Sequence, residues 1–204
     1  MIINPTEIEH ESMRIIQNII GSRYNGPEEN LPVIKRVIHA TADFDFLDNL
    51  FFSDNVITKT HEALRLRHER VIITDTLMLK SGISKNYGIN IICHVNDEET
   101  HSEAKSRGLT RAIINIERCV KEFPEAIYAI GNSPTALIRL CELIHEGKAK
   151  PALVIGVPVG FVNVIESKEL LLSLSDIPRI ISRGNKGGSP VACAIVNAIL
   201  YAMA

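Results

Sequence analysis

Five short runs of apolar, largely β-branched residues recur along the chain, and helical patterns follow four of them. The runs span residues 71–74, 90–93, 126–130, 153–157 and 179–181. Their apolar residues are continuous rather than alternating with polar ones, which is typical of strands that are buried on both faces. Strands of this kind, separated by helices, form a parallel sheet with helices on both sides. The sequence therefore predicts a doubly wound α/β fold with about five parallel strands.

Helical patterns also precede the first predicted strand, which is unusual for this class of fold. They span residues 5–20, 31–41 and 55–68, and we expect this N-terminal helical extension to build part of a site. Between the strands, helices are predicted at 110–123, 134–145 and 167–174. The last helix is predicted to begin near Ser189.

The composition suits one α/β domain over residues 1–204, stable without disulfides or a structural metal. Of the 204 residues, 46% are hydrophobic and 23% are charged, so a sizeable core can form. A formal net charge of −2 gives no general attraction to nucleic acid or to an anionic membrane, and neither partner is expected. The four cysteines lack a Cys-x-x-Cys pair, and the final apolar helix is too short to span a bilayer. We therefore expect a soluble, cytoplasmic protein.

Small polar residues follow several of the predicted strands, at the edge where open parallel sheets bind ligands. Four loops lie there, at 75–76, 131–135, 158–161 and 183–189. Hydroxyl and backbone N–H groups before a helix can receive carboxylates or phosphates, although each such residue is also a common helix cap. The candidate binding residues at this edge are Asp75, Ser133, Thr135, Arg183, Lys186 and Ser189.

The loop at 183–189 combines three glycines, two cations and a serine between a strand and a helix. Glycine allows a ligand to approach the backbone closely, so the loop is a candidate anion cradle. The simpler interpretation is a flexible turn in which Ser189 caps the helix and Pro190 occupies its first position. The order of residues does not match a nucleotide P-loop, because Lys186 precedes the paired glycines.

Two further residues are candidates for chemistry. His39 lies near the carboxyl end of the predicted helix 31–41, where the helix dipole favours an imidazolium and hence a proton donor. An exposed histidine that interacts only with the dipole fits the same position. Arg111 begins a helix, where a cation opposes the dipole. Either an anionic ligand or a carboxylate from another chain compensates for it, or it is simply solvated.

Other kinds of site find little support. His61 and His68 are about two helical turns apart, and His94 and His101 flank an acidic loop without a ligand motif, so no protein-bound metal is expected. A Gly-x-Ser-x-Gly elbow is absent, and no cysteine has a nearby helper motif. Covalent nucleophilic catalysis is therefore disfavoured.

Taken together, five segments resemble the precorrin-8X methylmutase family, which includes the cobalt-precorrin-8 methylmutases of corrin-ring biosynthesis. The resemblance covers nearly the whole chain. The segments are 37–46 (VIHATADFDF), 74–82 with Thr74, Asp75, Thr76, Met78 and Gly82, 131–137 (GNSPTAL), 156–168 (GVPVGFVNVIESK) and 183–189 (RGNKGGS).

The resemblance implies a flavodoxin-like, three-layer α/β/α homodimer that is an isomerase. It would move a methyl group from carbon eleven to carbon twelve of precorrin-8X or cobalt-precorrin-8, giving hydrogenobyrinate or cobyrinate. His39 matches the family's proton donor and acceptor, while Arg111 and Ser12 would line the substrate pocket near the dimer interface. The resemblance implies no cofactor, and cobalt would enter only inside the substrate.

Two alternative functions remain open at this stage. A phosphotransferase or nucleotide enzyme would use the glycine loop, although the loop order and the missing magnesium-binding acid pair argue against it. A tetrapyrrole carrier without catalysis would keep the anion-binding loops and would not need a histidine that changes protonation. Turnover separates the carrier from the enzyme.

Overall fold

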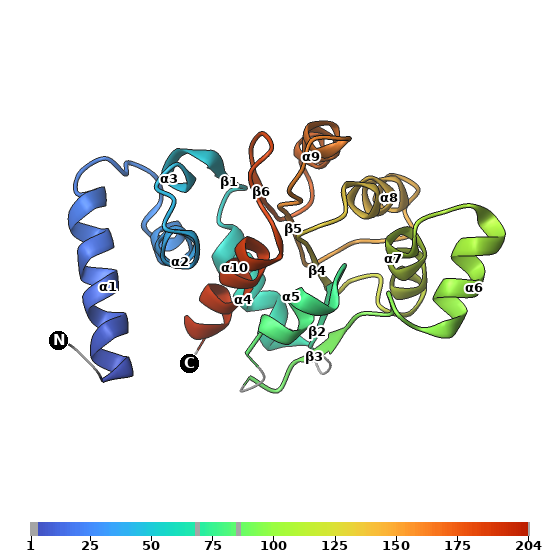
Figure 1. Cartoon of the computed structure of the whole chain (residues 1–204), viewed down its shortest axis with the longest axis horizontal. Helices are drawn as coiled ribbons and strands as arrows, with labels where there is room; N and C mark the ends of the chain where they lie inside the picture. The colour runs from blue at the N-terminus through green and yellow to red at the C-terminus, as the bar shows by residue number, and fades with distance from the viewer. Residues whose placement is uncertain (1–3, 68–69, 85–86, 204) are drawn as a thin grey trace.

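A computed structural model of the chain describes residues 4–67, 70–84 and 87–203. One six-stranded sheet crosses the molecule in the order β1-β6-β5-β4-β2-β3 (Figure 1). The strands are β1 (Leu50–Phe52), β2 (Val71–Thr74), β3 (Asn90–Ile92), β4 (Ile127–Ile130), β5 (Leu153–Gly156) and β6 (Arg179–Ser182). The five predicted strands are confirmed, and all pairings among these five are parallel.

The sixth strand was not predicted. Strand β1 pairs antiparallel with β6 at one edge of the sheet and is only three residues long. Without it, the parallel strands follow the order 2-1-3-4-5 of flavodoxin-like folds, with the switch point between β2 and β4. The three-layer, flavodoxin-like class is therefore confirmed, with one additional edge strand.

Ten α-helices are present in the described part of the chain. They are α1 (Pro5–Ile20), α2 (Leu31–Thr41), α3 (Phe46–Asn49), α4 (Val56–Leu66), α5 (Leu77–Gly82), α6 (Glu98–Arg107), α7 (Arg111–Glu122), α8 (Pro134–His145), α9 (Val164–Ser173) and α10 (Ser189–Tyr201). The predicted helices 5–20, 31–41 and 134–145 match α1, α2 and α8 to the residue. Of the predicted helix 55–68, α4 covers Val56–Leu66, and residue 68 lies outside the described ranges.

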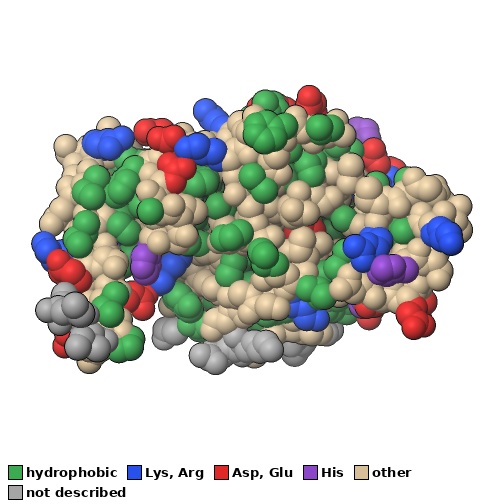
Figure 2. Space-filling model, viewed as in Figure 1, with side chains coloured by type: hydrophobic (Ala, Val, Ile, Leu, Met, Phe, Trp, Pro, Cys, Tyr) green, Lys and Arg blue, Asp and Glu red, His purple; other side chains and the backbone are tan. Residues whose placement is uncertain are grey.

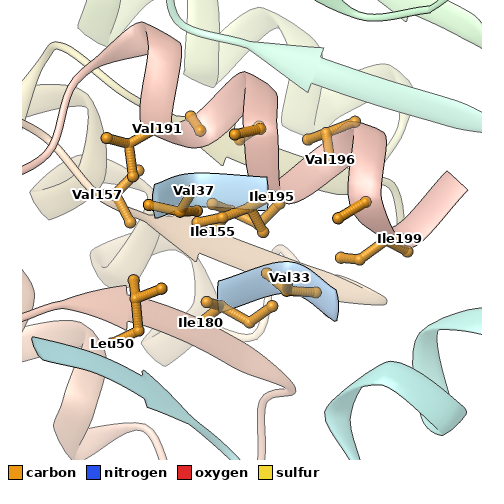
Figure 3. Close-up of a cluster of buried hydrophobic side chains, with 14 of the residues drawn as sticks. Val33, Val37, Leu50, Ile155, Val157, Ile180, Val191, Ile195, Val196 and Ile199 are labelled. Carbon is orange, nitrogen blue, oxygen red and sulfur yellow. The ribbon is translucent and has the colours of Figure 1, made fainter. Parts of the chain in front are cut away.

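The two faces of the sheet bury separate clusters of side chains. Helices α2, α4, α5 and α10 cover one face, where Ile155 and Ile180 pack against α2 and α10. Figure 3 shows this cluster, with Val37 of α2 and Ile195 of α10 meeting the side chains of β5 and β6. Helices α7, α8 and α9 cover the other face. Alternate residues of one strand face opposite sides of the sheet, so a continuously apolar strand is buried only if helices cover both faces.

Helices begin at the edge of the sheet where the parallel strands end. Ser133 caps α8 by accepting from the N–H of Ala136, and Thr110 caps α7 by accepting from the N–H of Ile113. The start of α10 follows β6 at the same edge. Several helix N-termini therefore converge on one edge of the sheet. No helix within the described ranges combines the length and apolarity that a membrane crossing requires.

Candidate functional site

Asp75 joins two of the predicted loops at the switch point between β2 and β4. Its side chain is 1% exposed, and its carboxylate accepts the N–H groups of Gly131, Asn132 and Ser133 at 3.1, 2.7 and 2.7 Å. Burial raises the pKa of Asp75, while these three N–H groups favour the charged form and act against the rise. Thr76, rather than Asp75, caps α5. Asp75 therefore fixes the loop after β4 by accepting hydrogen bonds from its backbone N–H groups.

The start of α10 lies against the same loop. The hydroxyls of Thr76 and Ser189 are hydrogen-bonded at 3.0 Å. A Cβ on Gly131 would come within 2.8 Å of the Ser189 Cα, so only glycine allows this contact between backbones. Ser189 is the first residue of α10 and not its cap, because the N-cap position belongs to Gly188. Its hydroxyl therefore holds two strand-end loops together.

The loop at 183–188 is anchored on several sides. Its Gly188 N–H donates to Val157 O at 2.9 Å, and Asn185 O accepts from the Gly160 N–H at 3.2 Å. The Lys186 ammonium binds the carboxylates of Asp43 at 2.7 Å and Asp45 at 2.5 Å. Hydrogen bonding to Asp43 and then to Asp45 raises the pKa of Lys186, so this group stays charged. The Lys186 charge is thus already paired with two carboxylates of the same chain, and Lys186 is a weaker candidate for binding a ligand carboxylate.

Arg183 is the second cation of this loop, and unlike Lys186 it is not paired with a carboxylate in the described part of the chain. It is exposed. Its backbone N–H donates to Asn49 O at 2.9 Å, so the residue is fixed at its backbone and open at its side chain. A guanidinium in this state suits a carboxylate ligand.

His39 lies in the last turn of α2 and is exposed. The helix ends at Ala42, whose left-handed conformation (φ 54°) turns the chain toward Asp43. Because Asp43 binds Lys186, the end of α2 lies at the same edge of the sheet as the glycine loop. Ser12 is half-buried on α1, which packs against α2, and its hydroxyl donates to Ile8 O at 2.8 Å.

Arg111 begins α7 on the other side of the sheet. Its Nη1 lies 3.1 Å from Asn96 Oδ1 and 2.8 Å from His101 Nε2, so an amide oxygen and an imidazole nitrogen hold the side chain. The Thr110 hydroxyl lies 3.3 Å from that of Thr135, which is in turn 3.0 Å from the Ser133 hydroxyl. The hydroxyls of Thr110, Thr135 and Ser133 therefore connect the starts of α7 and α8, next to Arg111 in the sequence.

One chain does not bring all of the predicted residues together. Helix α2 covers the opposite face of the sheet from α7, and Figure 1 shows the two near opposite ends of the molecule. His39 thus lies at one end of the site edge and Arg111 toward the other, while Ser12 lies on α1 beside α2. A cavity of about 550 Å³ lies between α1, α2 and α10, but it opens beside Leu31 and Lys35 in the first half of α2.

Exposed apolar side chains border the glycine loop, and the sequence interpretation gave them no role. In the loop after β5, Phe161 is 89% exposed and Val162 is 76% exposed, and Met78 after β2 is 69% exposed. Large apolar side chains exposed together mark a binding surface more often than singly scattered ones do. The signal in the sequence was an aromatic residue next to Gly160 in a loop that the topology places at the site.

Two of the buried cysteines are unreactive thiols. Burial raises the pKa of Cys119 and of Cys141 to about 12, which leaves both thiols protonated and unreactive at neutral pH. Within the described ranges, no three His, Cys, Asp or Glu side chains gather in a way that could hold a metal ion.

Comparison with known proteins identifies the family. The model of the family described as precorrin-8X methylmutase matches residues 7–202. The chain belongs to the precorrin-8X methylmutase family. It is 43% identical to a cobalt-precorrin-8 methylmutase of Synechocystis, over 93% of this chain and 92% of the relative. It is 42% identical to a cobalt-precorrin-8 methylmutase of Salmonella typhimurium, over 97% of this chain and 95% of the relative.

A solved structure supports the same assignment. The crystal structure of a precorrin-8X methylmutase from Thermus thermophilus superposes with a TM-score of 0.88 and 33% sequence identity. The match covers 97% of this chain and 96% of the solved one. The resemblance drawn from the five segments is thereby confirmed, and the chain is a methylmutase, an isomerase of cobalamin biosynthesis.

Proposed function

We propose that this methylmutase binds precorrin-8X or cobalt-precorrin-8 at the carboxyl edge of its sheet, with His39 as the proton-transfer residue. The observation that carries the proposal is the family match over residues 7–202, which includes every strand-end loop of the site. Cobyrinate or hydrogenobyrinate is the product, depending on whether the substrate carries cobalt.

The reaction is an isomerisation and is redox neutral. The bond between the methyl group and carbon eleven breaks while a bond to carbon twelve forms, and the methyl group never leaves the substrate. His39 gives a proton to the conjugated ring system and takes one back, so no proton is gained or lost overall. The reaction needs no external methyl donor, electron acceptor or other cofactor, and cobalt enters only as part of the substrate. The protein contributes orientation and stabilisation of the developing charge.

The chemistry of the edge suits a flat apolar ring that carries carboxylates around its rim. Figure 2 shows a face whose middle is mostly hydrophobic side chains and uncharged atoms, with most charged groups nearer its borders. Phe161 and Val162 offer apolar contact beside the glycine loop. Arg183 and Arg111 offer guanidinium groups, and the half-buried Ser133 and Thr135 at the start of α8 offer hydroxyl groups.

A homodimer with the site near its interface fits the separation of His39 from Arg111. A second copy would bring the α7 edge of one protomer to the α2 end of the other, so that each site draws on both chains. Helix α1 carries an apolar stripe that one chain leaves exposed, in which Ile8, Ile15 and Ile19 are 46 to 49% exposed. The protein would act as a dimer in the cytoplasm, as one domain over residues 1–204.

The first experiment is anaerobic incubation of the purified protein with cobalt-precorrin-8 and, separately, with metal-free precorrin-8X. The ring absorption spectrum follows conversion, and NMR identifies the product at unchanged mass. Conversion of either substrate supports the proposal and shows which form is preferred. Tight binding without conversion would favour a carrier, and no binding to either compound would overturn the proposal.

The shared site has its own test. His39→Ala and Arg111→Ala are made separately and then coexpressed with distinct tags, so that mixed dimers form. If each site takes His39 from one chain and Arg111 from the other, a mixed dimer holds one intact site. Random pairing then restores about a quarter of the unmodified activity. Activity that stays at the mean of the two separate variants would contradict a shared site.

A further inference from the structure

Lys168 of α9 is a buried cation that the roles assigned so far do not use. Its side chain is 2% exposed, and its Nζ donates to Gly184 O at 2.7 Å and to Lys186 O at 2.8 Å. No carboxylate pairs with it in the described part of the chain. Burying an ammonium without a counter-charge is costly unless its donors are well satisfied. Both of its acceptors are carbonyl groups of the glycine loop, so Lys168 acts on the loop itself.

The direction of those carbonyl groups fixes the direction of the neighbouring N–H groups. In a trans peptide the C=O and the following N–H point to opposite sides, and no cis peptide is present among the described residues. The carbonyls of Gly184 and Lys186 point at Lys168, so the N–H groups of Asn185 and Gly187 point away from it. Neither N–H has an acceptor in the described ranges.

The loop conformation is held at both of these peptide units. The Ser182 hydroxyl also donates to Lys186 O, at 2.7 Å, and Gly184 takes a left-handed conformation (φ 64°) that an L side chain rarely adopts. Successive N–H groups that point outward from a glycine-rich loop form an anion-binding concavity. Arg183, whose guanidinium is exposed, adds positive charge to the same loop.

We propose that Lys168 is a positioning residue that turns the N–H groups of Asn185 and Gly187 outward to receive one carboxylate of the corrinoid. This inference rests on the proposed function, because it assigns a substrate group to the loop. Lys168 does not touch the ligand. It determines whether the two N–H groups are presented together, and the effect is therefore on affinity more than on the chemical step.

Protonation offers a readout that a purely structural residue would not give. Burial lowers the pKa of Lys168 to about 8. Lys186, the nearest other amine of the loop, stays charged in this range because hydrogen bonds to Asp43 and Asp45 raise its pKa. Glu166 and Glu169, on the same helix as Lys168, are exposed carboxylates. Above about pH 8 the two bonds to the carbonyls lose their charge assistance and the loop is held less firmly.

The test is titration of cobyrinate into the unmodified protein, Lys168→Met and the control Lys150→Met. Lys150 is exposed and precedes β5 at the opposite edge of the sheet. We expect Lys168→Met to weaken binding by about tenfold, with KM raised more than kcat is lowered, as loss of ground-state binding requires. Lys150→Met stays within about twofold of the unmodified protein. A folded Lys168→Met variant with unchanged affinity would overturn the proposal.

The pH dependence of binding completes the test. Affinity of the unmodified protein for cobyrinate is expected to fall as the pH rises from about 7 to about 9.5, and that of Lys168→Met to stay flat. If Lys168→Met does not fold, the profile of the unmodified protein decides, and a flat profile refutes the role. Failure of the unmodified protein to bind cobyrinate at all would instead overturn the proposed function.

Discussion

Replacing Asp75 by asparagine should destabilise the protein and displace the loop that begins α8. An asparagine can place its one oxygen where the carboxylate accepts from Asn132 and Ser133, both at 2.7 Å. Its NH₂ group then faces the N–H of Gly131, now 3.1 Å from a carboxylate oxygen, so that one donor meets another. Two charge-assisted hydrogen bonds become neutral and a third is lost.

The size of the effect follows from these three bonds. A hydrogen bond to a charged group is worth about 1.5–3 kcal/mol and a neutral one about 1 kcal/mol, and an unsatisfied buried donor costs about 1–3 kcal/mol. Against these losses stands the cost of burying the carboxylate, which asparagine avoids and which raises the pKa of Asp75. We expect a net loss of about 2 kcal/mol, near the lower end of the sum. For a domain of this size that corresponds to a melting point lower by about 4–8 °C.

Urea unfolding at neutral pH, followed by circular dichroism, measures this loss directly. The exposed Asp54 provides the matched control, because Asp54→Asn makes the same chemical change outside the hydrogen-bonded loop. We expect the control to remain within about 0.5 kcal/mol of the unmodified protein. A loss below about 0.5 kcal/mol in Asp75→Asn would show that the three N–H groups find other acceptors, and that Asp75 does not hold the loop.

Four further results are expected. His39→Ala should abolish turnover without moving the melting point by more than about 1 °C, because the side chain is exposed; normal turnover would remove His39 from the chemistry. Arg111→Ala should weaken cobyrinate binding by about tenfold in a titration, and unchanged affinity would place it outside the site. Gly187→Ala should weaken binding and lower the melting point, because its Cβ would lie 2.2 Å from Val157 O; an unchanged titration and melt would contradict this packing. Burial lowers the pKa of Lys168 from 10.5 in the unfolded chain to about 8 in the folded protein. Between about pH 8 and pH 10.5 the unfolded chain therefore binds one proton that the folded protein does not, and the free energy of unfolding rises with pH. In urea titrations the unmodified protein should gain up to about 3 kcal/mol over Lys168→Met as the pH rises through that window, and a constant difference would refute the shift.

Local signals predicted most of the helices and all of the parallel strands. Helix α8 begins where Ser133 accepts from the N–H of Ala136 and Pro134 takes the first helical position, and both residues announce a helix start in the sequence. The buried strands were visible as apolar runs, since each lies under helices on both faces.

Two of the elements that were not predicted, β1 and α6, carry little local signal in the sequence. Strand β1 is three residues long and is a strand because it pairs with β6, more than a hundred residues later. Helix α6 buries only Thr100 and Ala104, so it lacks the apolar stripe that announces a helix. It is attached to the body of the protein through ion pairs such as that of Arg107 with Glu117.

The site shows the same division between local and distant information. The sequence identified the glycine loop and the strand-end hydroxyls because they sit at fixed places between a strand and a helix. It did not show that the Lys186 ammonium binds Asp43, 143 residues away, or that the Lys168 ammonium donates to two backbone carbonyls of the loop. Such contacts exist only in the folded chain, and they change which cation remains free for a ligand.

The central claim is an intramolecular methyl shift, and a substrate labelled with carbon-13 in the migrating methyl group tests it most directly. After incubation with the purified protein, the account predicts that the labelled methyl carbon is bonded to carbon twelve, at unchanged mass and with the full label retained. The same incubation with His39→Ala should leave the label on carbon eleven. A labelled methyl group that stays on carbon eleven with the unmodified, folded protein, or label lost from the product, would contradict the account.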